Sequence, residues 1–408
     1  MGDVCKKSWL YAYFTNQGFY TLTCDLQKIC AGNWQIVVIS PEMMLSKKFI
    51  KHVLRNPELS RRLLSVVVDE AHVVSHWGSD FRKKYGSLGI LHALLPKGTP
   101  FVTMSATLPP RVRNDVLNKL QFDKNNYVNI NLGNDRPNVS IVVRAIHNAM
   151  NTYSDLDFLI PTGVTEPSQV PKAFVYADNV AVGVDIEDRL YERSPRSFQE
   201  AGIIRPYSAA FSPEYRANVM ALFKAGVVRI LICTDAAGMV SDGGLLHDGQ
   251  LTSYQGCNIP DIDLVVQWKL PSSVSSFVQR AGRAARGNGR TGLAVLLVER
   301  SAYEVDVTRL NTETTHQIKP NARKSASKSK RAGEKTTYLK AGTKTYAANH
   351  GAGRGSYGGD HDKLVLKESV PLHRDLPDEG LYSLVQTGTC RRLVLTEVFD
   401  NGIPCKCF

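Results

Sequence analysis

Short apolar runs alternate along the chain with longer stretches in which apolar positions recur at helical spacing. This alternation predicts an α/β fold with mostly parallel strands, because buried parallel strands are apolar throughout and are joined by helices. The expected buried strands are Ile36–Ile39, Ser65–Val68, Phe101–Met104, Ala173–Tyr176, Ile230–Cys233, Leu264–Gln267 and Gly292–Val298.

Several of these runs end in polar or small residues. Ser40-Pro41 follows the first run, Asp69-Glu70 the second, Ser105-Ala106-Thr107 the third and Thr234-Asp235 the fifth. In an open α/β sheet the ligand crevice lies outside the carboxyl ends of the strands. We therefore expect the functional site at these ends.

The pattern divides the chain into four segments. It breaks near Asn134–Asn138, resumes at about Ala173 and stops after Arg300, which predicts two nucleotide-binding-type lobes at residues 1–140 and 141–310. Residues 311–362 are rich in Lys, Ser, Thr, Ala and Gly. Such a segment buries too little apolar surface to offset its ordering entropy, so a disordered basic linker is expected. A small module is expected at residues 363–408.

The charge balance favours a polyanionic partner. Fifty Lys and Arg against 38 Asp and Glu give a net charge of +12. Neutralising phosphates with such charges releases counterions, although the basic cluster between Arg323 and Lys344 accounts for part of the surplus. No stretch has the apolar length needed to cross a bilayer, so no membrane association is expected. The eight cysteines are scattered, which fits a reducing intracellular compartment.

The strongest local signal is an apolar strand that runs into two carboxylates, Val66-Val67-Val68-Asp69-Glu70-Ala71-His72. In nucleoside triphosphate hydrolysis one carboxylate holds Mg²⁺ and the other polarises the attacking water. An accidental acidic turn would look the same if this segment stood alone. Its companions decide between the two interpretations.

Three further segments follow in order. Ser105-Ala106-Thr107 comes after the next strand, and Ile230–Met239 is a strand that continues into a loop of small residues. The third segment is Gln279–Arg286, Q-R-A-G-R-A-A-R, in which Arg283 and Arg286 are three residues apart and share one face. Arginines in this arrangement suit a γ-phosphate contact, whereas an isolated R-x-x-R pair is usually a solvated basic surface.

At this point the chain resembles the superfamily 2 helicases with a D-E-A-H motif, and within them the RecQ family. Residues 75–82, S-H-W-G-S-D-F-R, resemble the aromatic-rich loop S-Q-W-G-H-D-F-R of that family, with two substitutions. Trp268-Lys269-Leu270-Pro271 matches the segment that leads to the arginine motif. The resemblance covers roughly residues 30–300 and implies two RecA-like lobes, the first incomplete.

The resemblance also implies roles for single residues. It implies that Asp69 coordinates Mg²⁺ and that Glu70 activates the attacking water. It also implies that His72, Ser105 and Thr107 link hydrolysis to movement. Its nucleotide contacts are Gly238, Asp261, Arg283 and Arg286, with Gln279 in the same catalytic group. Its nucleic-acid contacts are Ser40, Pro41, Trp77, Phe81, Arg82 and Thr234.

One departure from the family concerns the phosphate-binding loop. The chain contains no G-x-x-x-x-G-K-S/T, and Gly342-Thr343-Lys344-Thr345 lies in the basic segment without a preceding strand. That loop supplies the backbone cradle and the lysine that hold the phosphates. We therefore expect a first lobe that is truncated at its N-terminus and turnover by this chain that is weak or absent.

Two other departures lie further along the chain. The family's A-G-M-G-x-D/N-I-P is interrupted after Met239 by residues 240–255, which we interpret as intron sequence translated in frame or, less favoured, a genuine loop insertion. Cys390-Arg391-Arg392 and the later Cys405 and Cys407 resemble the start of the family's zinc module. Zinc prefers four ligands and only three candidates are present. Two interpretations therefore remain: a partial zinc site, or reduced cysteines that bind no metal.

The resemblance predicts an ATP-dependent 3′-to-5′ DNA helicase of recombination and repair, with ATP and Mg²⁺ as cofactors and zinc as a further candidate. The expected partner is DNA, single-stranded and at duplex junctions. One alternative is a DNA-binding helicase remnant without catalysis. A second is an RNA helicase, which the aromatic loop and the Cys-Arg-Arg tail disfavour. The basic run Arg323–Arg331 is typical of a nuclear localisation signal or a DNA tether, so a nuclear location is expected. The preferred DNA structure and the oligomeric state stay open.

Overall fold

The computed structural model describes residues 11–14, 22–77, 84–234, 259–308 and 370–402 of the 408-residue chain. The chain divides into two compact units, Met1–Asn131 and Leu132–Phe408. Each unit is an α/β structure with parallel strand pairs. The predicted four-segment division of the chain stays a prediction. Within the described residues, no helix is long and apolar enough to cross a membrane.

In unit 1 the described strands form two parallel pairs. β1 (Tyr11–Phe14) pairs with β2 (Ile36–Ile39), and β3 (Val66–Val68) pairs with β4 (Phe101–Thr103). The helices of this unit are α1 (Leu22–Ala31), α2 (Pro41–Met44), α3 (Lys47–Phe49), η1 (Ile50–Leu54), α4 (Pro57–Arg62), α5 (His72–Trp77), η2 (Tyr85–Ile90), α6 (Leu91–Leu94) and α7 (Pro110–Lys119).

One hydrophobic core in unit 1 joins these helices to alternate strand residues such as Val66 and Val68. The other strand positions are exposed, for example Val67 at 52% and Val102 at 42%. Their burial pattern is therefore that of strands covered on one face, whereas their sequences had predicted burial on both faces.

In unit 2 the described strands form a six-stranded parallel sheet in the order β5-β10-β9-β6-β8-β7. They are β5 (Val139–Ala145), β6 (Ala173–Tyr176), β7 (Ile204–Tyr207), β8 (Ile230–Cys233), β9 (Leu264–Trp268) and β10 (Gly292–Val298). The helices are η3 (Met150–Thr152), η4 (Ser154–Leu159), η5 (Pro167–Gln169), α8 (Val180–Arg193), α9 (Arg196–Ala201), α10 (Pro213–Ala225), α11 (Val274–Ala281), η7 (Arg300–Tyr303), α13 (Leu381–Gln386) and α14 (Arg391–Val398).

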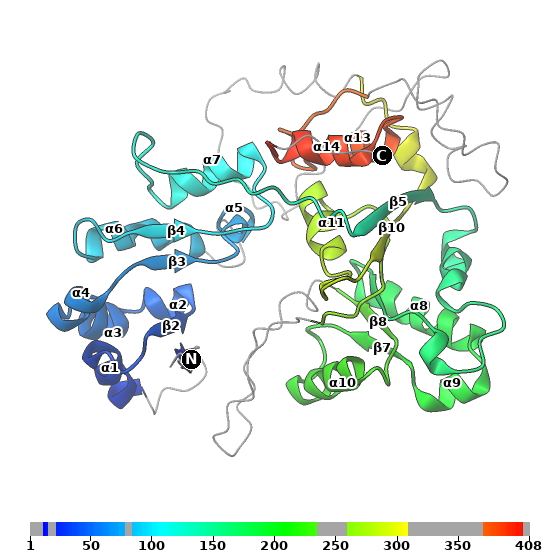
Figure 1. The fold of residues 1–408 in the computed structure, drawn as a ribbon, viewed down its shortest axis with the longest axis horizontal. Helices are drawn as coiled ribbons and strands as arrows, with labels where there is room; N and C mark the ends of the chain where they lie inside the picture. Colours follow the sequence, from blue (N-terminus) through cyan, green and yellow to red (C-terminus); the bar gives the residue numbers. More distant parts are fainter. Residues whose placement is uncertain (1–10, 15–21, 78–83, 235–258, 309–369, 403–408) are drawn as a thin grey trace, which may run out of the picture. The chain divides into compact units, whose positions relative to one another are not determined.

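Helices cover both faces of this sheet, and alternate residues of each strand enter different cores. Phe174 and Tyr176 of β6 pack in one core with residues of α10, α11, α13 and α14. Ala173 and Val175 pack in the other core with α8, α9 and η4. In Figure 1, α13 and α14 (red) lie beside α11 and β5. The terminal segment thus shares its hydrophobic core with the second sheet.

The sequence predicted the central strands of this sheet and missed its two edges. β6, β8 and β10 have the predicted bounds, and β9 is one residue longer than predicted. β5 and β7 were not predicted because polar residues interrupt their apolar runs, such as Arg144 in β5 and Arg205 in β7. Edge strands tolerate this, and Pro206 in β7 is likewise typical of an edge.

Candidate functional site

The acid pair lies at the carboxyl end of β3, as the sequence predicted. Parallel pairing of β3 with β4 continues past Val68, because the Ala71 N–H donates to the Met104 carbonyl at 2.9 Å. This pairing brings residues 69–72 next to residues 105–107. Asp69 and Glu70 are both exposed, so their carboxylates are open to solvent at the strand end.

The turn that presents the two carboxylates is strained. Glu70 has a φ of +48°, a conformation that is uncommon for a residue with a side chain and costs on the order of 1 kcal/mol or more. The Asp69 Oδ1 atom accepts a hydrogen bond from the Glu70 N–H at 2.8 Å, which holds the turn. Strain of this kind gathers at functional sites, where the rest of the structure maintains it.

A hydrogen-bond chain joins the acid pair to Ser105 and Thr107. His72 Nδ1 lies 3.3 Å from Glu70 Oε2 and 2.9 Å from Ser105 Oγ. Ser105 Oγ in turn donates to the Thr107 carbonyl at 3.2 Å and accepts from the Thr107 N–H at 3.1 Å. Since a carboxylate accepts only and the Ser105 proton is already used, a proton on His72 Nδ1 satisfies both of its contacts.

The chain is mostly shielded from water. His72 is 7% exposed and Thr107 is fully buried, while Glu70 is exposed. The network therefore connects a solvent-facing carboxylate to a buried turn. Hydrogen bonds in such a low-dielectric setting are stronger than on the surface.

Helix α7 supports α5, the helix that begins at His72. Lys119 Nζ donates to the carbonyls of Val74 and Ser75 at 3.4 Å and pairs with Asp115 at 2.7 Å. Burial alone would raise the pKa of Asp115, but hydrogen bonds from Lys119 and Ser75 outweigh it and lower that pKa. Asp115 is thus held ionised, and the cation that satisfies the last carbonyls of α5 stays in place.

The remaining predicted residues of unit 1 are described in part. Ser40 is the N-cap of α2 and accepts from the Met43 N–H at 3.3 Å, with Pro41 at the first helical position. Both residues therefore also have a local structural role. Trp77 ends α5. Phe81 and Arg82 lie outside the described residues.

In unit 2 the arginine motif is built on α11 and the turn that follows it. Gln279 and Arg283 are half-buried, and Arg286 is exposed with its Nε donating to the Gly282 carbonyl at 3.1 Å. Thr234 is half-buried directly after β8, and Gly238 lies outside the described residues. Gln279, Arg283, Arg286 and Thr234 all belong to unit 2, the unit with the six-stranded sheet.

Arg280, which the sequence analysis did not single out, anchors α11 to the sheet. Its side chain is 7% exposed, pairs with Asp178 at 2.7 Å, donates to the buried Gln267 side chain and lies over the Tyr176 ring. Asp178 and Gln267 stand at the carboxyl ends of β6 and β9. Arg280 therefore fixes α11, which carries Gln279 and leads into the turn that carries Arg283.

Asp261 lies just before β9, at the amino ends of the strands, whereas Asp178 and Gln267 lie at their carboxyl ends. Both of its carboxylate oxygens accept from Lys172 Nζ at 2.9 Å, and Lys172 is 1% exposed. The lysine also donates to the Lys224 carbonyl at 3.3 Å and lies over the Phe223 ring. This contact gives Asp261 a structural partner, and its predicted nucleotide contact stays a prediction.

The predicted zinc ligands are mostly outside the described residues. Cys390 is the half-buried N-cap of α14, whereas Cys405 and Cys407 are not described. In the described part of the chain, no three His, Cys, Asp or Glu side chains gather as a metal site. The zinc interpretation stays a prediction.

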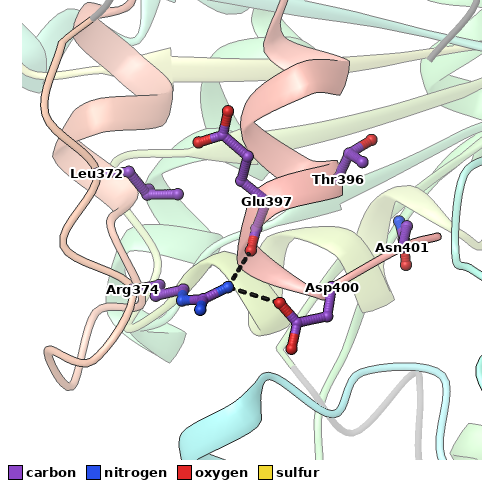
Figure 2. Close-up of a pocket in the computed structure, with 6 residues that line it drawn as sticks. All are labelled: Leu372, Arg374, Thr396, Glu397, Asp400 and Asn401. Carbon is purple, nitrogen blue, oxygen red and sulfur yellow. Dashed lines mark hydrogen bonds and ion pairs between the residues drawn. The ribbon is translucent and has the colours of Figure 1, made fainter. Parts of the chain in front are cut away.

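An open pocket of about 540 Å³ lies near the end of α14 and contains none of the predicted site residues (Figure 2). Arg374 crosses it, donating to the Glu397 carbonyl at 2.9 Å and to Asp400 Oδ1 at 2.6 Å. The charge of Arg374 is therefore already paired within the protein.

Comparison with known families identifies two matching regions. The family described as DEAD/DEAH box helicase matches residues 18–116, and the family described as helicase conserved C-terminal domain matches residues 156–288. The first match includes the acid pair and residues 105–107. The second includes the arginine motif.

Two curated relatives and one solved structure agree with these matches. The chain is 25% identical over 278 residues to the ATP-dependent DNA helicase RecQ of Pasteurella multocida, covering 68% of this chain and 37% of that protein. It is 25% identical over 252 residues to the ATP-dependent DNA helicase hus2/rqh1 of Schizosaccharomyces pombe, covering 62% and 17%. The chain thus spans well under half of each relative. A crystal structure of the helicase MrfA bound to DNA matches with a TM-score of 0.51 at 15% identity, over 72% of this chain and 38% of that one, which shows the fold.

Proposed function

We propose that this chain, which is a RecQ-like helicase with a DEAD/DEAH box domain and a helicase C-terminal domain, serves ATP-dependent unwinding of DNA in the 3′-to-5′ direction. The observation that carries the proposal is the hydrogen-bond chain from Glu70 through His72 to Ser105 and Thr107. It joins a candidate hydrolytic carboxylate to the Ser105–Thr107 turn of the same unit, which fits a link between hydrolysis and movement.

In this proposal Asp69 and Glu70 act on the nucleotide. Exposed carboxylates fit Mg²⁺, a hard cation that prefers oxygen ligands, and the cation would offset charge on the phosphates. Asp69 would hold Mg²⁺, and Glu70 would orient the attacking water and accept its proton. His72, which contacts both Glu70 and Ser105, would then transmit a change at Glu70 to Ser105.

The arginine motif would supply positive charge. Arg283 and Arg286 would stabilise charge that develops on the transferred phosphoryl group, with Gln279, Gly238 and Asp261 as further nucleotide contacts. Arg280 has a different task in this proposal, because its buried pairing with Asp178 already uses its charge to hold α11.

DNA would be the partner, and Ser40, Pro41, Trp77, Phe81, Arg82 and Thr234 its contacts. The formal charge of +12 supports a polyanionic partner. Aromatic rings such as Trp77 and Phe81 suit stacking with unpaired bases. We also propose a nuclear location and a role in recombination and repair, with Cys390, Cys405 and Cys407 as candidate zinc ligands.

The test is DNA-stimulated phosphate release by the 408-residue chain under single-turnover conditions with protein in excess. Because the sequence has no G-x-x-x-x-G-K-S/T, we expect slow release and little unwinding of a 3′-tailed duplex. Glu70→Gln should lower the DNA-stimulated rate by about 100-fold, the contribution of a general base. Glu200→Gln, an exposed residue of α9, is the matched control and should leave the rate unchanged.

Other outcomes favour the alternatives. Salt-sensitive DNA binding without any Glu70-dependent phosphate release would identify a non-catalytic DNA-binding protein. Phosphate release that single-stranded RNA stimulates and DNA does not would favour the RNA helicase. Either result would contradict the proposal.

A further inference from the structure

Helix α11 is held at its amino end by a residue of the terminal segment. Glu379 is fully buried, and its Oε2 atom accepts from the Ser275 N–H at 2.7 Å. The Val274 N–H donates to the Asp378 carbonyl at 3.2 Å. These acceptors satisfy amide groups that the first turn of a helix leaves without intrahelical partners, and the carboxylate suits the positive end of the helix dipole.

The carboxyl end of α11 continues into residues 282–286, the arginine turn, which carries Arg283 and Arg286. Arg136 donates to three carbonyls of this turn, those of Gly282 at 3.1 Å, Ala284 at 3.2 Å and Ala285 at 3.0 Å. Asn138 adds a bond to the Ala285 carbonyl at 2.9 Å. Carbonyls at a helix end lack intrahelical donors, so a cation that bridges three of them fixes their directions.

The segment that provides Arg136, residues 134–138, is itself fastened to α14. Arg392 pairs with the Asp135 side chain and donates to the carbonyls of Arg136 at 3.1 Å and Val139 at 2.6 Å. Asn401 donates to the Asn134 side chain at 2.9 Å. The side chain of Arg392 is 20% exposed, so most of its contact with residues 134–139 is shielded from solvent.

We propose that the terminal segment positions the arginine turn. Glu379, just before α13, acts at the start of α11, and Arg392 of α14 acts through Arg136 at its end. The functional meaning rests on the proposed role of Arg283 and Arg286 at the nucleotide. Arg392 and Arg136 are positioning residues, because each contacts the backbone or another side chain of the protein.

The physical reason is that α11 and its turn are short. An isolated eight-residue helix is marginal in water, so its geometry depends on tertiary contacts. The contacts come from three distant parts of the sequence, around residues 136, 379 and 392. Removing one polar link should therefore loosen the turn without melting the central strands, because β6 and β8 also pack in a second core with α8, α9 and η4.

Native-state hydrogen exchange of the 408-residue chain tests this relay, with trypsin cleavage after Arg283 and Arg286 as a second readout. Arg392→Ala should speed exchange of amides 282–287 by about tenfold, equivalent to about 1.4 kcal/mol, and leave β6 and β8 unchanged. Arg136→Ala should speed exchange of the same amides by at least the same factor. In the Arg136→Ala background, Arg392→Ala should add nothing at the turn. Arg196→Ala, an exposed arginine of α9, is the matched control.

Arg392→Lys, which keeps the charge but loses the forked geometry, should restore part of the protection and covers the case in which Arg392→Ala does not fold. The proposal is overturned if Arg392→Ala leaves the turn protected, speeds β6 and β8 equally, or adds its full effect in the Arg136→Ala background. These readouts need neither nucleotide nor DNA. The outcome of the phosphate-release test therefore bears on the proposed function alone, and the exchange data decide this inference.

Discussion

Replacing Asp155 with alanine is expected to lower the free energy of unfolding of unit 2 by about 4 kcal/mol at pH 7, a loss typical of a broken buried ion pair. Asp155 is 2% exposed and accepts from Arg144 at 3.0 Å and from the N–H groups of His147 at 3.1 Å and Asn148 at 2.8 Å. The Asn148 side chain also donates to it. Without the carboxylate, the loop after β5 loses its acceptor and Arg144 loses this ion pair.

The same residue makes a pH-dependent contribution to stability. Burial alone would raise the pKa of Asp155, but the hydrogen bonds from His147, Asn148 and Arg144 outweigh it and lower that pKa below its ordinary 3.8. The unfolded chain has a pKa near 3.9. A group with a depressed folded pKa stabilises fully above the unfolded value, and its contribution is lost as pH falls through the folded pKa.

Urea denaturation between pH 7 and pH 3, followed by hydrogen exchange in β6 and β9, measures both effects. The difference in the free energy of unfolding between wild type and Asp155→Ala should be constant above about pH 5. It should shrink as the pH falls toward 3. Asp375→Asn, at an exposed aspartate of the same unit, should change the free energy of unfolding by less than about 0.5 kcal/mol. A gap that widens on acidification would contradict the assignment.

Asp261→Ala should lower the free energy of unfolding of unit 2 by about 3 kcal/mol, because it leaves the buried ammonium of Lys172 without its anion. The effect is at the lower end for a buried pair since the Asp261 side chain is 40% exposed. Replacing Lys172 with methionine in the same chain removes the unpaired charge, so Lys172→Met/Asp261→Ala should regain most of the loss. The urea midpoints of the two single variants and the double variant measure this coupling.

This cycle also separates two roles of Asp261. If Asp261 only holds Lys172, the double variant should regain phosphate release together with stability. If Asp261 contacts the nucleotide, the double variant should be stable but slow. A double variant as unstable as Asp261→Ala would show that the ion pair is not the source of the stability.

The sequence by itself determined the central strands and the local motifs. β6, β8 and β10 are continuous apolar runs, and that pattern needs no knowledge of neighbours because both faces of each strand are buried. Asp69, Glu70 and His72 follow a strand directly, so their position at its carboxyl end is a matter of chain geometry. The pairing of His72 with Ser105 follows from the parallel register of β3 and β4.

Only the tertiary structure decided which residues hold the arginine turn. Arg136, Glu379 and Arg392 are separated from α11 by more than ninety residues, and nothing in their local sequence specifies a partner. The same is true of Lys172, which reads as a surface lysine until Asp261 is placed beside it. The edge strands β5 and β7 needed the sheet order as well, because a partly exposed strand carries polar residues that hide its periodicity. The local pattern of apolar and polar residues predicts which strands are buried and where they end. Long-range ion pairs and backbone caps form only when the chain folds.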